Sequence, residues 1–224
     1  MSEDFDHIVG LGGFCRTAHQ LRRLSGVDAA HVFDWWVTTS PALVAVLEDG
    51  FRDLFRQENM RIDLGDPLAK SVVCARYGLW HYHDFDEALI DGAPHPLLVR
   101  QECSRNLAKY AALVRRFLAV SGRLLLVRDC GDFRLLHGKR TDLDEPEQGR
   151  LLAALDRLLP GADWRLLLLN SALPDTGDPR VVRDVIDSHG CTVWEDSDLG
   201  WNEMAQRQGI RPRRPVNAAL PAAE

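Results

Sequence analysis

The sequence lacks three features, and each absence excludes a broad class of protein. It contains no apolar run near the roughly 20 residues that a membrane-spanning helix needs, so we expect no membrane partner. Its five cysteines are an odd number without a CxxC pair, which argues against a disulfide framework and a structural zinc site. Basic residues are not in excess, since the net charge is -6, and we expect no nucleic-acid partner.

The composition that remains is that of a packed domain. The chain has 224 residues, of which 46% are hydrophobic, and this is enough to build a full core. Its first residues, MSEDFDHIV, are acidic and do not resemble a signal peptide, so we expect a cytoplasmic protein with reduced thiols. We expect one α/β domain over residues 1–209 and a loose tail, without periodicity, over 210–224. The oligomeric state is left open.

Continuous apolar segments in the second half of the chain predict a parallel sheet. RLLLVRD (123–129) and WRLLLLNS (164–171) are typical of strands buried on both faces, and an amphipathic helix over 146–159 separates them. We expect a further helix from Asp178 through Ile186 and a third strand at 191–196. With the opening strand added, the prediction is a three-layer α/β fold, with a mostly parallel sheet and helices on both faces.

The first half predicts further helices and a hairpin. Ser40 and Pro41 are typical of a helix start, as N-cap and first-turn residue. Residues 71–85 indicate one or two strands around Gly78, and residues 98–120 form the clearest amphipathic helix.

Cys15 is the strongest candidate for a reactive group. The stretch HIVGLGGFCRTAHQLRRL (7–24) predicts a short strand, a glycine turn and a helix, with Cys15 near the helix start. Free backbone N–H groups and the helix dipole favour a thiolate at that position, which would make the cysteine nucleophilic. The competing interpretation is a buried, inert cysteine. The letters GLGGFC depart from the GxGxxG fingerprint of dinucleotide-binding proteins, and we expect no cofactor.

Polar residues follow the predicted strands, and in a parallel sheet these strand ends share one edge with Cys15. They include Arg128, Asp129, Asn170 and the acidic residues from Glu195 onward. We therefore expect a cleft at that edge, which would take a small-molecule or peptide substrate. The residues expected to bind the substrate are Gly12, Gly13, Phe14, Trp35, His81, Arg128 and Trp201.

The segment WHYHDF (80–85) offers partners for the cysteine. His81 and His83 alternate on the presumed strand and would share one face, with Asp84 on the other face unless the strand ends there. Such histidines could supply a catalytic base, ligate a metal together with Asp84, or simply be hydrogen-bonded at a strand end. The spacing alone does not choose among these three.

The order of these motifs resembles a known family. LGGFCRTAHQLRRL, HVFDWWVTT, a helix leading to GFRDLF, then HDF, RRFL and LLLVR together resemble DUF1796, described as putative papain-like cysteine peptidases. The likeness covers most of residues 7–128, with Val32 in place of a usual proline. The resemblance implies Cys15 as nucleophile, His83 as its base, and Asp84 or Asp34 as orienting groups. It also implies a papain-like α+β fold as the alternative architecture.

These observations predict a cysteine-dependent hydrolase or acyl transferase of peptidase-like character. Two alternatives remain open at this point. One is a metal-dependent site on His81, His83 and Asp84. The other is a noncatalytic domain that binds a sugar or a nucleotide.

Overall fold

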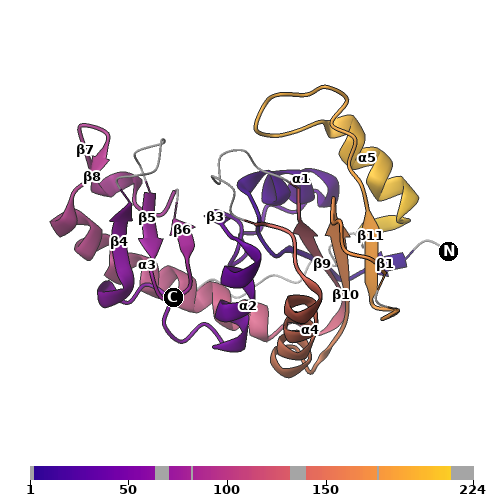
Figure 1. The fold of residues 1–224 in the computed structure, drawn as a ribbon, viewed down its shortest axis with the longest axis horizontal. Helices are drawn as coiled ribbons and strands as arrows, with labels where there is room; N and C mark the ends of the chain where they lie inside the picture. The colour runs from indigo at the N-terminus through magenta and orange to yellow at the C-terminus, as the bar shows by residue number, and fades with distance from the viewer. Residues whose placement is uncertain (1–2, 64–70, 82, 132–139, 176, 213–224) are drawn as a thin grey trace.

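A computed structural model describes residues 3–63, 71–81, 83–131, 140–175 and 177–212. Two four-stranded sheets organise this part of the chain, one parallel and one antiparallel (Figure 1). The helices are α1 (Cys15–Ser25), α2 (Ser40–Glu48), α3 (Pro96–Leu118), α4 (Glu145–Leu158) and α5 (Asp198–Arg207), with short 3-10 turns η1 (Gln57–Asn59) and η2 (Asp86–Ala88). The strands are β1 (Glu3–Phe5), β2 (His7–Gly10), β3 (Trp36–Val37), β4 (Met60–Asp63), β5 (Ser71–Cys74), β6 (Leu79–His81), β7 (Leu89–Ile90), β8 (Ala93–Pro94), β9 (Gly122–Asp129), β10 (Ala162–Leu169), β11 (Val181–Asp184) and β12 (Ile210–Pro212).

The parallel sheet has the strand order β11-β10-β9-β2. Successive residues of β9 enter different cores, because side chains alternate across a strand. Leu126 packs with α4 in the larger core, whereas Val127 packs with residues of α1 and α5 in a second core. Both sides of these strands are therefore buried, which explains their unbroken apolar sequence.

The second sheet is antiparallel, with the order β3-β6-β5-β4. The expectation of one mostly parallel sheet is therefore wrong for this half of the fold, although the hairpin around Gly78 is confirmed. Helix α3 runs from the antiparallel sheet to the parallel one (Figure 1). Its Tyr110 stacks on Trp36 at 4.9 Å, and its Phe117 contacts Phe33 at 6.2 Å, so one helix packs along a continuous core.

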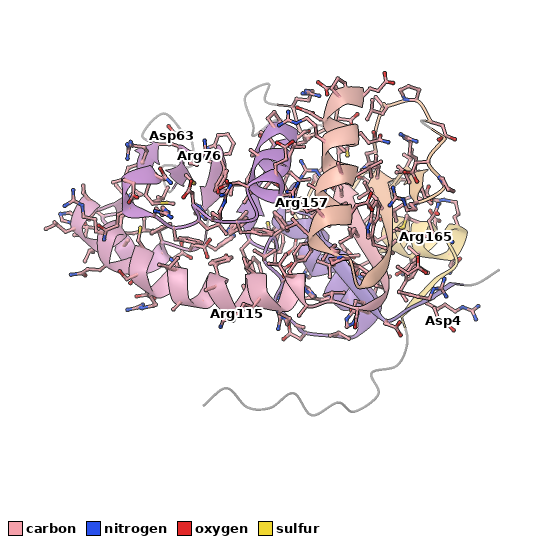
Figure 2. All side chains as sticks on the ribbon, turned by 90° about the horizontal axis from the view of Figure 1, so that it is seen from below. Asp4, Asp63, Arg76, Arg115, Arg157 and Arg165 are labelled. Carbon is pink, nitrogen blue, oxygen red and sulfur yellow. The ribbon has the colours of Figure 1, made fainter. Side chains whose placement is uncertain are left out.

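Helices α2 and α4 pack against each other between the sheets. Arg157 of α4 extends toward the last turn of α2 and donates hydrogen bonds to the carbonyl oxygens of Leu47 and Glu48 at 3.1 and 2.8 Å (Figure 2). The Leu47 carbonyl also accepts from the backbone N–H of Gly50 at 3.1 Å, and a cation at a helix C-terminus is favoured by the helix dipole. The N-cap of α2 is Thr39 rather than the expected Ser40.

Two predictions between residues 178 and 196 are wrong. Val181–Asp184 is the strand β11 rather than part of a helix, and residues 191–196 contain no strand. The stretch PRVVRDVI is short, and its apolar spacing fits either structure, so contact with β10 decides it. Val193 and Trp194 are 60% and 54% exposed, which removes the burial that a central strand requires.

The chain remains part of the fold beyond the expected boundary at residue 209. Strand β12 pairs in parallel with β1, with Glu3 opposite Ile210 and Phe5 opposite Pro212. The rest of the predicted tail, 213–224, lies outside the described residues. No described helix combines the length and the apolar character that crossing a bilayer would require.

The buried side chain of Arg128 connects the parallel sheet to the segments that surround its edge. The guanidinium donates to the carbonyl oxygens of Leu11, Thr38 and Thr141 at 3.1, 2.7 and 3.0 Å, and to the Thr38 hydroxyl at 2.8 Å. Its exposed fraction is 0%, and no carboxylate of the described residues pairs with it. Three separate stretches of backbone thus depend on one cation for their hydrogen bonds.

Replacing this arginine should therefore weaken the whole fold. We expect Arg128→Met to lower the free energy of unfolding by about 3 kcal/mol, since three buried carbonyl groups lose their donors. Urea denaturation followed by circular dichroism measures the change. Arg115→Met is the matched control, because Arg115 lies exposed on the outer side of α3, and its replacement should change stability by less than about 0.5 kcal/mol (Figure 2). Equal stability of the two variants would contradict this account of Arg128.

Candidate functional site

The strand, glycine turn and helix expected around Cys15 are confirmed. Strand β2 ends at Gly10, and Cys15 is the first residue of α1. Gly12 and Gly13 have φ angles of 72° and 101°, a region that strongly favours glycine. A Cβ atom at Gly13 would stand 2.6 Å from the carbonyl oxygen of Asp129, so this position also lacks room for a side chain.

The thiol of Cys15 is half-buried, and its environment sends its pKa in the direction opposite to the one expected. Burial raises the pKa and outweighs the backbone N–H groups of Cys15 and Arg16, which act with the Arg16 charge to lower it. Glu195 adds a further rise. The helix start therefore does stabilise the thiolate, but desolvation costs more. The resting thiol is protonated at neutral pH and needs a proton acceptor in order to react.

The remaining cysteines are less suited to react, with one exception. Cys74, Cys103 and Cys130 are buried, and burial raises the pKa of Cys103 to about 11 and of Cys130 to about 12. Cys191 is half-buried like Cys15, and it is the natural comparison for any labelling experiment.

The polar ends of the parallel strands meet beside Cys15. Arg16 donates to Asp129 at 2.7 Å and lies 3.6 Å from Asp196. Asn170, directly after β10, also donates to Asp129 at 3.0 Å. The carboxylate of Asp129 therefore binds donors from α1 and from the end of β10, and it holds this edge of the sheet together.

One face of α1 carries Cys15, His19 and Arg22, at spacings of four and three residues. His19 lies one helical turn from Cys15, and its ring contacts Trp194 edge-on at 5.4 Å. No described residue forms a hydrogen bond with the His19 ring. His19 is not among the residues expected from the sequence, although the spacing in CRTAH carries the signal.

Trp35 lies beside Arg22 of this helix face, and His83 lies beside Trp35. The Arg22 guanidinium is 5.2 Å from the Trp35 ring centre, and Trp35 meets His83 edge-on at 5.6 Å. His83 is exposed, with Asp86 at 3.9 Å. His81 and His83 do not share a face as expected, because β6 ends at His81, whose side chain is fully buried.

Asp84 is a buried anchor for His81. Its carboxylate accepts hydrogen bonds from Trp36 Nε1 at 2.9 Å and the Tyr110 hydroxyl at 2.8 Å, and it lies 3.1 Å from His81 Nδ1. Burial alone would raise the pKa of Asp84, but hydrogen bonds from His81 and Tyr110 and the charge of Lys109 lower it. The described contacts of Asp84 therefore stabilise the antiparallel sheet against α3.

Asp34 also has defined partners. It accepts from Arg22 at 2.6 Å and from the backbone N–H of His31 at 2.7 Å. Burial raises the pKa of this carboxyl, while those two partners oppose the rise. Asp34 thus fixes α1 against the segment that leads into β3, and the described contacts of its carboxylate include no histidine ring.

Several residues expected to bind substrate are buried and cannot contact it in this structure. Arg128, Trp201 and His81 are fully buried. The N–H of Gly13 donates to the Thr38 hydroxyl at 2.7 Å and is not free for a ligand, and Gly12 is buried as well. Phe14 and Trp35 are half-buried and remain accessible. Within the described part of the chain, no three histidine, cysteine or acidic residues gather in a way that could hold a metal ion.

A half-buried cysteine at the start of a helix, beside the polar ends of a sheet, is the arrangement expected of a thiol-dependent enzyme. Residues 6–116 match the model of a family described as "Putative papain-like cysteine peptidase (DUF1796)". The matched segment is just under half of the chain, and it confirms the resemblance drawn from the motifs. No curated protein and no solved structure matches the chain.

The glycine turn gives a direct test of the geometry ahead of Cys15. We expect Gly13→Ala to destabilise the protein by about 3 kcal/mol, because a positive φ and a backbone clash add together. Gly78→Ala is the control, since Gly78 has a φ of 75° but open space around it, and it should cost only about 1 kcal/mol. Thermal unfolding of both variants measures the difference, and similar costs would mean that the turn tolerates a side chain.

The raised pKa of Cys15 predicts how alkylation depends on pH. Iodoacetamide reacts with the thiolate, so the rate at Cys15 should rise through pH 9, the ordinary thiol value, and reach half its maximum above it. Mass spectrometry of labelled peptides follows each cysteine separately. A midpoint below pH 7 at Cys15 would show that the helix start outweighs burial.

Proposed function

We propose that the chain is a cysteine-dependent hydrolase or acyl transferase in which Cys15 is the nucleophile. The observation that carries the proposal is the half-buried thiol at the first position of α1, within reach of the backbone N–H groups of Cys15 and Arg16. The family description supports a peptidase-like activity, and therefore a peptide or a related carbonyl compound as substrate.

The proposed reaction has two steps, acylation of the Cys15 thiol and cleavage of the resulting thioester. A neutral imidazole takes the Sγ proton, and the thiolate attacks the substrate carbonyl carbon to form a C–S bond. The oxyanion that results is stabilised by N–H groups in the first turn of α1, and the imidazolium gives its proton to the leaving amine or alcohol as the C–N or C–O bond breaks. Water, or another nucleophile in a transferase, then cleaves the thioester and frees the thiol.

Two histidines are candidates for the imidazole. The family resemblance implies His83, which contacts Trp35 beside α1. The helix spacing supports His19, which lies one turn from Cys15 and has no hydrogen-bond partner among the described residues. Because Asp84 and Asp34 are bound to other groups in this structure, we propose positioning roles for them rather than direct contact with the base.

The test uses p-nitrophenyl acetate, a small ester that acylates nucleophilic thiols. We expect a burst of nitrophenolate and an acetyl group on Cys15, both lost in Cys15→Ala and both retained in Cys191→Ser. Replacing the histidine that acts as base should slow acylation at neutral pH by about a hundredfold or more. His19→Gln and His83→Gln therefore identify it, with circular dichroism to confirm folding.

Two outcomes would overturn the proposal. Acetylation of Cys191 with Cys15 unmodified would place the reactive thiol elsewhere. If neither wild type nor Cys15→Ala shows a nitrophenolate burst, the chain is a noncatalytic binding domain.

A further inference from the structure

A second concave site lies away from Cys15, beside the amino ends of the parallel strands. It is formed by the second half of α1, the chain from Phe5 to Ile8, the segment from Val27 to Asp34, and the end of α3 with the residues that follow it. The cavity encloses about 350 Å³, a size that fits a small organic ligand. Cys15 is not among its lining residues, so ligand binding here can be measured separately from the proposed thiol chemistry.

The lining combines an apolar floor with a polar rim. Phe5, Leu21 and Phe117 are buried residues that line the floor. The titratable and charged groups around it are Asp6, His7, Arg22, His31, Asp34 and Arg116. Ligand sites commonly show this division, in which apolar walls supply contact area and a few polar groups fix orientation.

The cations at the rim are incompletely paired. Arg116 is exposed and forms no ion pair or hydrogen bond with any other described residue. Arg22 binds Asp34 through one terminal nitrogen and lies 3.5 Å from the exposed Asp28 through the other, but its Nε is buried without an acceptor in the described part of the chain. A buried donor that lacks an acceptor costs free energy, and an anion in the cavity would remove that cost.

The other ionisable groups do not cancel this positive charge. Asp34 is already bound by Arg22 and the His31 backbone, and Asp6 accepts from the Arg123 backbone N–H at 2.9 Å. Burial, and then the charges of Arg116 and Arg22, lower the pKa of His31 to about 4. At neutral pH His31 is therefore uncharged and offers a ring nitrogen without repelling or attracting a ligand.

We propose that this cavity binds a small molecule that carries one anionic group, a carboxylate or a phosphate, on an apolar body. The apolar part lies against Phe5, Leu21 and Phe117, and the anionic group pairs with Arg116 at the rim. A cationic ligand is disfavoured, because both nearby carboxylates already have partners.

Phenyl phosphate and benzoate are the anionic probes, and benzylamine and benzyl alcohol are the cationic and neutral ones. We expect the two anions to raise the melting temperature and to shift the ring signals of His31, with no shift at His189, which pairs with Glu203 elsewhere. Arg116→Gln should weaken binding of the anions about tenfold, the loss of one charge-assisted contact. Arg115→Gln, one residue away and outside the cavity, should bind like wild type.

Three results would overturn the inference. These are equal binding of benzylamine and the anions, equal affinities of Arg116→Gln and Arg115→Gln, and anion binding that leaves the His31 signals unmoved. Protein alkylated at Cys15 should bind the anions normally, so a failure here is separate from a failure of the thiol chemistry.

Discussion

The buried guanidinium of Arg128 is the contact on which the edge of the parallel sheet beside Cys15 depends. It extends from β9 to the backbone of the glycine turn, to the link between β3 and α2, and to the chain at Thr141. The Thr38 hydroxyl that it contacts also accepts from Gly13. The two sheets and the start of α1 therefore share one cation, and the position of Cys15 follows from it. An apolar residue at position 128 could fill the space but could not satisfy three carbonyl groups.

The free-energy cost of burying a charge is offset by nearby donors both at this edge and in the antiparallel sheet. Asp129 and Asp84 are buried carboxylates, and each is compensated by several donors drawn from distant segments. Cys15 has weaker compensation, because backbone N–H groups do not fully offset its desolvation. The fold thus keeps a neutral thiol beside groups that are already paired. A neutral thiol is a weaker nucleophile than a thiolate, so the proposed chemistry at Cys15 requires a neighbouring base.

The sequence predicted those parts of the fold that local pattern determines. The long apolar runs of β9 and β10 and the glycine turn before Cys15 needed no knowledge of the tertiary structure. The predictions for residues 178–196 were wrong because the sequence pattern there is short. Pairing at the edge of the sheet, rather than local pattern, determines that Val181–Asp184 is a strand. The partners of Asp84 could not be foreseen, since Tyr110 lies 26 residues away and on another element. The end of β6 at His81, which separates His81 from His83, is likewise set by pairing rather than by composition.

The pairing of β1 with β12 has a consequence for how the chain reaches its final form. Residues 3–5 can meet residues 210–212 only after the chain between them has been synthesised, because the two strands are more than 200 residues apart in sequence. Closing so long a loop carries a large entropic cost, which must be met by structure that has already formed between the two strands. The elements between β1 and β12 bring the two strands together, so this pairing depends on the rest of the fold rather than on local sequence.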